Sequence, residues 1–275
     1  MGYRKRLLVV TDFHNCHFDW HGIKTDVRMR NMVEDICEEH EKDPLEMIIF
    51  LGDYSLDHWK WQIKGSYLAQ GVSNTKNFME KYRPDLPDVP MFWLAGNHEQ
   101  YGEEKWKEIT GNSRQGYTVI EDYLIIMWDS FGGELDPDYH HDGVYTPMNG
   151  EWVKGLMAEY PDKKVIFCSH YFNADREKEN ASIVADDRVV MLFGGHNHSS
   201  HVATLGEEFG AKPLAFAGNY SETPGNSNPW GYRELILTDE SVESTYIIPE
   251  NEMIVFDQPF KLEARRMNSV SVAVK

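Results

Sequence analysis

The sequence predicts a layered α/β domain, and three observations support this prediction. Helical patterns separate several of the predicted strands. Later in the chain, beyond Gly195, strands follow one another with little helix between them. Short apolar runs end abruptly at polar residues, as buried strands do; they are Leu7 to Val10, Met47 to Leu51, Met91 to Ala95, Val165 to Cys168 and Val189 to Phe193. Because strand, helix and strand alternate, we expect helices packed against a sheet.

Two segments have the apolar spacing of amphipathic helices. The first runs from Thr25 to His40, and its apolar residues recur every three or four positions: Met29, Met32, Val33, Ile36 and Cys37. We therefore interpret Cys37 as a core residue. The second runs from Glu151 to Tyr160, and its inward residues are expected to be Trp152, Leu156 and Met157.

The late part of the chain predicts a second, more antiparallel sheet. Its strands are expected at Val202 to Leu205, Leu214 to Ala217, Glu234 to Leu237 and Ser244 to Ile248. The segment from Asn219 to Trp230 is rich in Asn, Gly, Pro and Ser and predicts a long loop. We expect one domain over residues 1–250 and a C-terminal extension over residues 251–275. In that extension we expect an edge strand at Ile254 to Phe256 and fraying from Arg265 to Lys275.

Composition and charge exclude several classes of protein. The 275 residues suffice for one domain with a sizeable core, and a formal net charge of -18 disfavours binding to nucleic acid or anionic lipid. No stretch approaches the roughly 20 apolar residues of a membrane helix, and Leu7 to Val10 is too short for a signal peptide. The three cysteines are too few and too far apart for a disulfide framework. We expect a soluble, cytoplasmic protein without a membrane partner, and its oligomeric state stays open.

Side chains that bind metals follow one predicted strand after another. The strand ends read Asp12-Phe13-His14, Gly52-Asp53, Gly96-Asn97-His98-Glu99, Ser169-His170 and Gly195-His196-Asn197-His198. Ligands of α/β sheets bind at the carboxyl ends of strands. Residues two apart on an extended chain point the same way, so Asp12 is expected to pair with His14, and His196 with His198. Each motif alone is more often a turn, a cap or a core histidine, and it is their succession that predicts a metal site.

The ligand types suit divalent manganese, iron or zinc, whose ligands are imidazole and carboxylate groups. Asp53 stands alone after its strand, and its carboxylate has two oxygens, so we expect it to bridge two ions. One ion is assigned to Asp12, His14, Asp53 and His198, and the other to Asp53, Asn97, His170 and His196.

From about Leu7 to about Leu237 this succession of motifs resembles the calcineurin-like metallophosphoesterase superfamily. The resemblance implies a four-layer sandwich of two mixed β-sheets flanked by helices, with a dinuclear metal centre at the sheet edges. It also implies that His98 is catalytic and acts as general acid or as stabiliser of the leaving group. The tyrosine ligand of purple acid phosphatases and the Asp-Arg-Gly of Ser/Thr protein phosphatases are missing from the matching positions.

The predicted function is hydrolysis of a phosphoester by water activated between two divalent ions. A small phosphodiester is favoured over a monoester, because no Arg or Lys adjoins a ligand motif, whereas acidic and aromatic residues do: Asp19, Trp20, Asp57, Trp59, Glu99 and Tyr101. A phosphomonoesterase, a nuclease and a non-catalytic scaffold of the same fold are the alternatives. The acidic balance counts against the nuclease, and the complete ligand set counts against the scaffold.

Three residues are candidates for contact with the substrate. Asn219 and Tyr220 open the late loop, and His17 lies in the loop after the first ligands. Other loop residues are candidates for the mouth of the site, although such residues are more often merely solvated: Asp19, Trp20 and His21. An aromatic platform is a further candidate, although Trp at this spacing is as often packed in a core: His58, Trp59 and Trp61.

Overall fold

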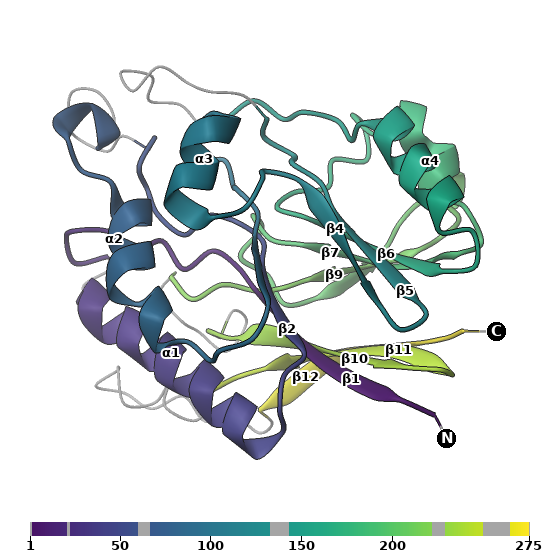
Figure 1. Ribbon diagram of the computed structural model, residues 1–275, viewed down its shortest axis with the longest axis horizontal. Helices are drawn as coiled ribbons and strands as arrows, with labels where there is room; N and C mark the ends of the chain where they lie inside the picture. The colour runs from purple at the N-terminus through teal and green to yellow at the C-terminus, as the bar shows by residue number, and fades with distance from the viewer. Residues whose placement is uncertain are drawn as a thin grey trace.

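Two six-stranded β-sheets lie face to face in the computed structural model of the chain, with helices on the outer side of each sheet (Figure 1). The structure describes residues 2–20, 23–59, 67–132, 143–221, 229–249 and 265–274. The predicted four-layer sandwich of two mixed sheets is thereby confirmed. Within the described part of the chain, no helix is both long enough and apolar enough to cross a membrane.

The first sheet has parallel strands at one end and antiparallel strands at the other. Its order is β12 (Arg266–Ala273), β11 (Ser241–Ile247), β10 (Tyr232–Thr238), β1 (Arg4–Val10), β2 (Met47–Phe50) and β3 (Met91–Trp93). Strands β1, β2 and β3 are parallel to one another, whereas β10 is antiparallel to β1 and to β11. The carboxyl ends of β1, β2 and β3 therefore lie at one edge of the sheet.

The second sheet has parallel strands in its middle and an antiparallel strand at each edge. Its order is β4 (Gly116–Ile120), β5 (Tyr123–Met127), β6 (Lys164–Ser169), β7 (Val189–Gly194), β9 (Pro213–Phe216) and β8 (Val202–Thr204). Strands β5, β6, β7 and β9 are parallel, and β4 and β8 are antiparallel edge strands.

Helices cover both outer faces (Figure 1). The α-helices are α1 (Thr25–Lys42), α2 (Asn74–Lys81), α3 (Glu103–Thr110), α4 (Gly150–Glu159) and α5 (Ala181–Val184), and the short 3-10 helices are η1 (Leu68–Gln70), η2 (Arg83–Asp85), η3 (Lys178–Asn180) and η4 (Glu207–Phe209). Residues of α1, α2 and α3 pack on the first sheet, and residues of α4 and α5 pack on the second.

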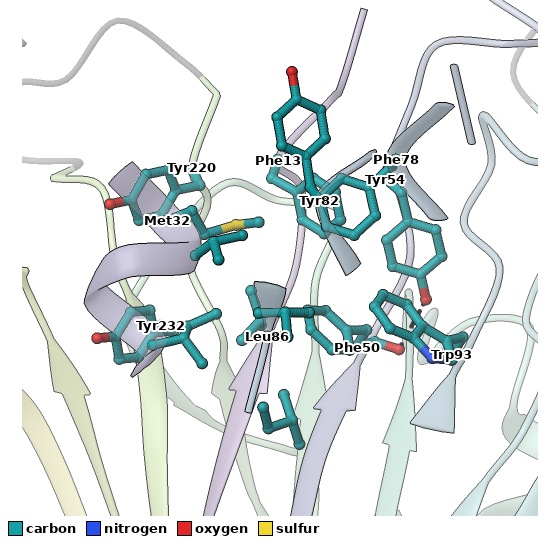
Figure 2. Packing of buried hydrophobic residues seen from close by; sticks show 14 of the residues in the cluster. Phe13, Met32, Phe50, Tyr54, Phe78, Tyr82, Leu86, Trp93, Tyr220 and Tyr232 are labelled. Carbon is teal, nitrogen blue, oxygen red and sulfur yellow. Dashed lines mark hydrogen bonds between the residues drawn. The ribbon is translucent and has the colours of Figure 1, made fainter. Parts of the chain in front are cut away.

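Strand β1 is apolar from Leu7 to Val10, where both of its faces are buried. Successive side chains of a strand point to opposite faces. Leu7 and Val9 pack between the two sheets, while Leu8 and Val10 pack under α1 with Met32. Figure 2 shows this second cluster, in which Met32 of α1 lies over the first sheet. Burial on both faces explains why the sequence shows continuous apolar runs instead of alternation.

The five early strands and both predicted helices are confirmed within one or two residues at most boundaries. In α4, Leu156 and Met157 are buried as predicted, but Val153 takes the inner position expected of Trp152, which is half-buried. Cys37 is half-buried and packs against the core under α1. The hairpin of β4 and β5 and the helices α2 and α3 were not predicted.

The prediction that the late strands form a sheet of their own is wrong. Strands β8 and β9 extend the second sheet beside β7, whereas β10 and β11 extend the first sheet beside β1. The parallel strands formed by the early part of the chain leave unpaired edges in both sheets, and the late strands pair with these edges. An apolar pattern predicts that a strand is buried but does not specify which strand it pairs with.

The predicted fraying of Arg265 to Lys275 is also wrong over most of that segment. Strand β12 pairs with β11 from Ser241↔Ala273 to Ile247↔Arg266. Val270 and Val272 alternate with polar residues and pack against the core between the sheets, which holds the strand in place. The predicted strand at Ile254 to Phe256 lies outside the described residues.

Candidate metal centre

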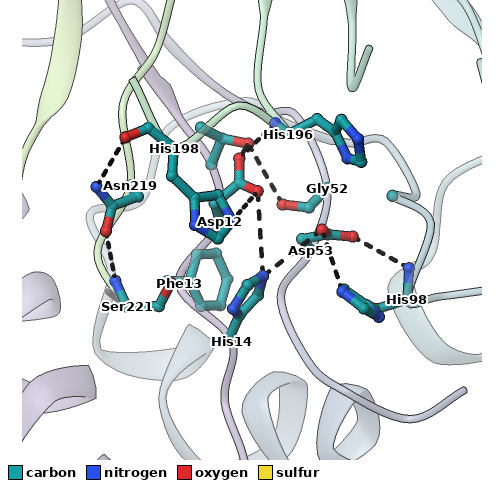
Figure 3. A network of polar contacts seen from close by, with 12 residues as sticks. Asp12, Phe13, His14, Gly52, Asp53, His98, His196, His198, Asn219 and Ser221 are labelled. Atoms are coloured by element: carbon teal, nitrogen blue, oxygen red, sulfur yellow. Dashed lines mark hydrogen bonds and ion pairs between the residues drawn. The ribbon is translucent and has the colours of Figure 1, made fainter. Parts of the chain in front are cut away.

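The five polar turns predicted from the sequence meet at the edges of both sheets. In the first sheet, the turn after β1 carries Asp12 and His14, the turn after β2 carries Asp53, and the turn after β3 carries Asn97 and His98. In the second sheet, the turn after β6 carries His170, and the turn after β7 carries His196 and His198. Figure 3 shows most of these side chains pointing toward one another from different strands. The carboxyl ends of parallel strands in two facing sheets thus form one site.

Most of these residues adopt a left-handed backbone, which non-glycine residues rarely do. The φ angles are 53° at Asp12, 42° at His14, 53° at Asp53, 64° at His196 and 49° at His198. Each such residue costs about 1–2 kcal/mol of backbone strain. The extended-chain argument for pairing Asp12 with His14, and His196 with His198, is therefore wrong. The side chains meet because the chain turns sharply after each strand.

Hydrogen bonds between neighbouring turns hold this strained backbone. The N–H of Asp12 donates to Gly52 O at 3.1 Å, and the N–H of His14 donates to Asp53 O at 3.0 Å. Glycine is required where the turns touch. A Cβ at Gly96 would lie 2.1 Å from Asp53 Oδ1, and one at Gly195 would lie 2.7 Å from Asp12 Oδ2.

The first predicted ligand set has its donor atoms within contact distance. Asp12 Oδ1 lies 3.1 Å from His198 Nε2 and 4.0 Å from His14 Nε2, and His14 Nε2 lies 3.5 Å from Asp53 Oδ2 (Figure 3). The four residues predicted for one ion are therefore brought together.

The second predicted set meets at the opposite side of Asp53. His170 Nε2 lies 3.2 Å from Asp53 Oδ2 and 2.9 Å from Asn97 Oδ1, and His196 Nδ1 lies 2.8 Å from the same Asn97 oxygen. Asp53 Oδ1 accepts the N–H of His98 at 3.1 Å. Of the two carboxylate oxygens, Oδ2 therefore faces both ligand sets, and the bridging role of Asp53 stays a prediction.

The donor atoms fit divalent cations. Asp12 and Asp53 are buried carboxylates that repel each other, and in the described part of the chain both pair with histidines and with no Lys or Arg. No hydrogen bond among the described residues reaches Nδ1 of the buried His14. Buried polar atoms normally have partners, and cations coordinated by oxygen and imidazole ligands would supply charge compensation here.

Comparison with known proteins agrees with this geometry. The sequence profile described as calcineurin-like phosphoesterase matches residues 5–200. The chain belongs to this family. Its members bind a dinuclear metal centre, and the two ligand sets around Asp53 are the residues of this calcineurin-like phosphoesterase that could hold one.

Three similar proteins place this calcineurin-like phosphoesterase among its relatives. It is 24% identical over 212 residues to a probable cyclic nucleotide phosphodiesterase from Pseudoalteromonas sp. (strain SM9913), covering 71% of this chain and 72% of that protein. It resembles in structure a purple acid phosphatase from yellow lupin (Lupinus luteus) seeds, with a TM-score of 0.58, 10% identity, and coverage of 99% of this chain and 54% of the lupin chain.

The third similar protein is the one named as the anchor in the inner membrane complex of Plasmodium. The TM-score is 0.54 at 10% identity, and the match covers 95% of this chain and 90% of the Plasmodium chain. At such identities these two structures show a shared fold only.

Charges in the calcineurin-like phosphoesterase site are strongly coupled. Burial lowers the pKa of His14 to about 4, so its ring is neutral and able to act as a ligand. Burial lowers the pKa of His170 too, but the charges of Asp53 and Asp12 outweigh this effect and raise it to about 9. Burial raises the pKa of Asp53, yet His170 and His98 draw it well below its usual range. The buried carboxylates and histidines of the site thus determine one another's pKa values.

Glu99 is a supporting residue whose role the sequence did not reveal. Its Oε2 accepts the N–H groups of Asp53 at 2.8 Å and Gly96 at 3.0 Å, and its Oε1 accepts the N–H and hydroxyl of Ser55 at 2.8 and 3.0 Å. Burial and the charge of Asp53 raise the pKa of Glu99 to about 8, while the N–H groups of Ser55 and Gly96 act in the opposite direction. Glu99 thus ties the turn after β2 to the turn after β3.

Arg28 of α1 is a second supporting residue. It is fully buried, and its guanidinium donates to the backbone carbonyls of Phe13, of His14 at 2.9 Å and of Tyr220 at 3.2 Å. It therefore ties the turn of the first ligands to the late loop. In the sequence Arg28 resembles an ordinary surface charge and Glu99 belongs to the third polar motif, and only their contacts reveal these roles.

The imidazole of His170 is oriented by a backbone carbonyl. Its Nδ1 lies 2.8 Å from Leu51 O, which leaves Nε2 facing Asp53 and Asn97. Hydrogen bonds of this kind fix the tautomer and the ring direction of a metal-binding histidine.

Two of the predicted substrate contacts are wrong. Tyr220 is fully buried in the core under α1, where its hydroxyl donates to Asp35 and its ring stacks on Trp230 (Figure 2). Asn219 is also fully buried, and its side chain donates to His198 O at 3.3 Å and accepts the N–H of Ser221. Asn219 thus supports the turn of His198 and offers no surface to a substrate. Tyr220 and Trp230, at the described ends of this segment, pack in the core under α1, which sequence composition does not reveal.

His17 is exposed, as a substrate contact requires, but it contacts other residues than the predicted ligands. Its Nδ1 lies 3.3 Å from Asn74 Oδ1, and its ring packs on Phe18 and Tyr67. It lines a cavity of about 590 Å³ to which none of the seven predicted ligands contributes. Contact of His17 with a substrate stays a prediction.

Several of the acidic and aromatic residues near the motifs have structural roles. Asp57 is buried and accepts the N–H groups of Asn74 and Thr75 at the start of α2, and Tyr101 donates its hydroxyl to Asp57. Two aromatic residues, Trp20 and Trp59, remain half-buried beside the site. His21 and Trp61 lie outside the described residues.

Proposed function

We propose that this chain is a metal-dependent hydrolase of small phosphodiesters. The observation that carries the proposal is the position of Asp53 Oδ2, which lies 3.5 Å from His14 Nε2 and 3.2 Å from His170 Nε2, between two sets of ligand atoms. Two divalent ions held there, manganese, iron or zinc, supply an activated water at neutral pH and withdraw charge from phosphoryl oxygens.

The protein residues divide the remaining work. Asp12, His14 and His198 hold one side of the centre with Asp53, and Asn97, His170 and His196 hold the other. Four charges from two divalent ions exceed the two carboxylate charges, so the centre stays positive within an acidic protein and attracts an anionic phosphoester.

His98 acts on the leaving group in this proposal. Its Nε2 lies 3.8 Å from Asp53 Oδ2, and its backbone N–H is held by Asp53 Oδ1, so its ring stands beside the centre while Asn97 supplies the ligand of the same turn. From there a protonated His98 can donate to the departing oxygen. The alternative role is metal ligation, because His98, His14 and Asp53 place donor atoms within 4.8 Å of one another.

A diester is favoured for two reasons. In the described part of the chain no Lys or Arg pairs with the carboxylates of the centre, so none of the described cations at these carboxylates is placed to meet the second charge of a monoester. The relative from Pseudoalteromonas sp. (strain SM9913) is named as a probable cyclic nucleotide phosphodiesterase, and a cyclic nucleotide is a small diester. A phosphomonoester is the alternative substrate class.

A binding scaffold is the alternative from another class of function. The protein named as an anchor in Plasmodium shares the fold. Against this role, all seven predicted ligands and His98 are present and lie together at one site. A small-molecule substrate, a cytoplasmic location and the absence of nucleic-acid and membrane partners complete the proposal.

The direct test compares a diester with a monoester under equal metal loading. We expect the manganese-loaded protein to cleave bis(p-nitrophenyl) phosphate with a higher kcat/KM than p-nitrophenyl phosphate. A clear preference for the monoester would overturn the diester assignment, and no hydrolysis of either ester with two ions bound would favour the scaffold.

A further inference from the structure

Four aromatic rings beside the candidate metal centre contact one another in a closed cycle. His14 and His98 meet edge to face with ring centroids 5.4 Å apart. Trp20 lies 6.2 Å from His14, Trp59 lies 6.4 Å from His98, and the two indoles lie 5.4 Å from each other. Each of these contacts is nearly perpendicular, with angles between 83° and 89°. Each indole therefore lies next to one of the two histidines, Trp20 next to His14 and Trp59 next to His98.

We propose that Trp20 and Trp59 form a subsite for a leaving group that carries a planar aromatic ring. This inference rests on the proposed function, because it concerns the ester group whose oxygen His98 protonates. Both indoles are half-buried, so each retains surface for contact with a ligand. Flat apolar faces and edges at such a position favour an aromatic group over an aliphatic group of similar size.

The position of His98 determines which substrate group reaches the indoles. Asp53 lies on one side of the His98 ring and is buried among backbone N–H groups, so it leaves no room for an organic group. Trp59 lies on another side of the ring. In this proposal, an ester group bound through the oxygen that receives the His98 proton extends past Trp59 toward Trp20.

A different aromatic cluster lies on the other side of the centre. Tyr171 packs 4.5 Å from His196, and Phe131 packs 5.7 Å from His170. These rings adjoin the second ligand set and have no contact with His98 in the described structure. Substitution of the indoles should therefore change the preference of the enzyme for the leaving group. It should have little effect on the preference for the group that stays on the phosphate.

The test uses two diesters that differ only in the leaving group. Methyl p-chlorophenyl phosphate has an aromatic leaving group, and methyl hexafluoroisopropyl phosphate has an aliphatic one of similar acidity. We expect the manganese-loaded wild-type protein to show a kcat/KM about 10-fold higher for the aryl ester. Trp59→Leu and Trp20→Leu should each remove most of this ratio, because each removes one of the two indoles.

Trp152→Leu is the matched control, because Trp152 is half-buried on α4 and packs on the second sheet, away from the site. It should leave the ratio unchanged. Equal rates for both esters in the wild type would overturn the subsite even if a variant fails to fold. Equal loss of both activities in a variant that keeps two ions would overturn it as well. If the wild type cleaves neither ester with two ions bound, the proposed function fails first.

Discussion

Replacement of Glu99 by Gln tests whether the Glu99 carboxylate stabilises the turns after β2 and β3 as strongly as its hydrogen bonds indicate. The carboxylate accepts four donors, two on each oxygen. Gln keeps one oxygen and turns an amide NH2 group toward the other two donors. In the metal-loaded protein the ions compensate the charge of Asp53, so Glu99 accepts these bonds as an anion.

The expected cost follows from these contacts. Hydrogen bonds to a charged group contribute about 1.5–3 kcal/mol each, so the loss of two gives about 3–6 kcal/mol. A domain whose stability exceeds about 6 kcal/mol, within the usual range of about 5–15 kcal/mol, remains folded after this loss. Where the amide NH2 group faces the N–H groups of Asp53 and Gly96, Asp53 also loses the bond that holds its left-handed backbone, so the affinity for both ions should fall together.

Urea unfolding of the manganese-loaded protein measures the loss of stability, and manganese titration of the metal-free protein measures the loss of affinity for the ions. Glu104→Gln is the matched control, because Glu104 is exposed on α3, and it should change the stability by about 0.5 kcal/mol or less. A Glu99→Gln protein with wild-type stability and wild-type manganese affinity would refute the support that we assign to this carboxylate.

Three further predictions concern neighbouring residues. His98→Ala should keep two ions but lose on the order of 10² to 10⁴ in turnover, and the loss should be smaller for esters with very good leaving groups. If the variant loses an ion instead, His98 is a metal ligand. Gly96→Ala should abolish the binding of both ions, because its Cβ would strike Asp53, whereas Gly155→Ala, with nothing within 4 Å, should be tolerated; equal metal content in both variants would contradict this. His170 has a raised pKa, so its stabilising effect in the metal-free protein is complete below pH 6.5 and is lost as the pH rises through about 9; urea midpoints that rise over this range would contradict the assignment.

The strands and the order of the ligands could be predicted because each depends on local sequence. An apolar run such as Leu7 to Val10 is buried on both faces wherever it pairs, and the polar residue that follows it marks the end of the strand. The helix from Thr25 follows from the spacing of its apolar residues in the same way. These features require no knowledge of which strands become neighbours.

The remaining features depend on contacts between distant parts of the chain. The pairing of β1 with β10 joins Arg4 to Thr238, and nothing in either strand specifies the other. The burial of Tyr220 depends on its contact with α1, a distant segment of the chain, where Asp35 accepts its hydroxyl. The left-handed turn at Asp53 is sustained by backbone hydrogen bonds and Glu99, so the sequence indicates the residue but not its conformation.

The most direct test of the account is a manganese titration of the metal-free wild-type protein and of Asp53→Asn, with His14→Ala for comparison. We expect close to two ions per wild-type chain, because the ligands form two sets that share Asp53 Oδ2. Asp53→Asn should weaken both sites together, whereas His14→Ala should weaken mainly one. A reproducible maximum of one ion per wild-type chain in excess manganese would contradict the shared centre.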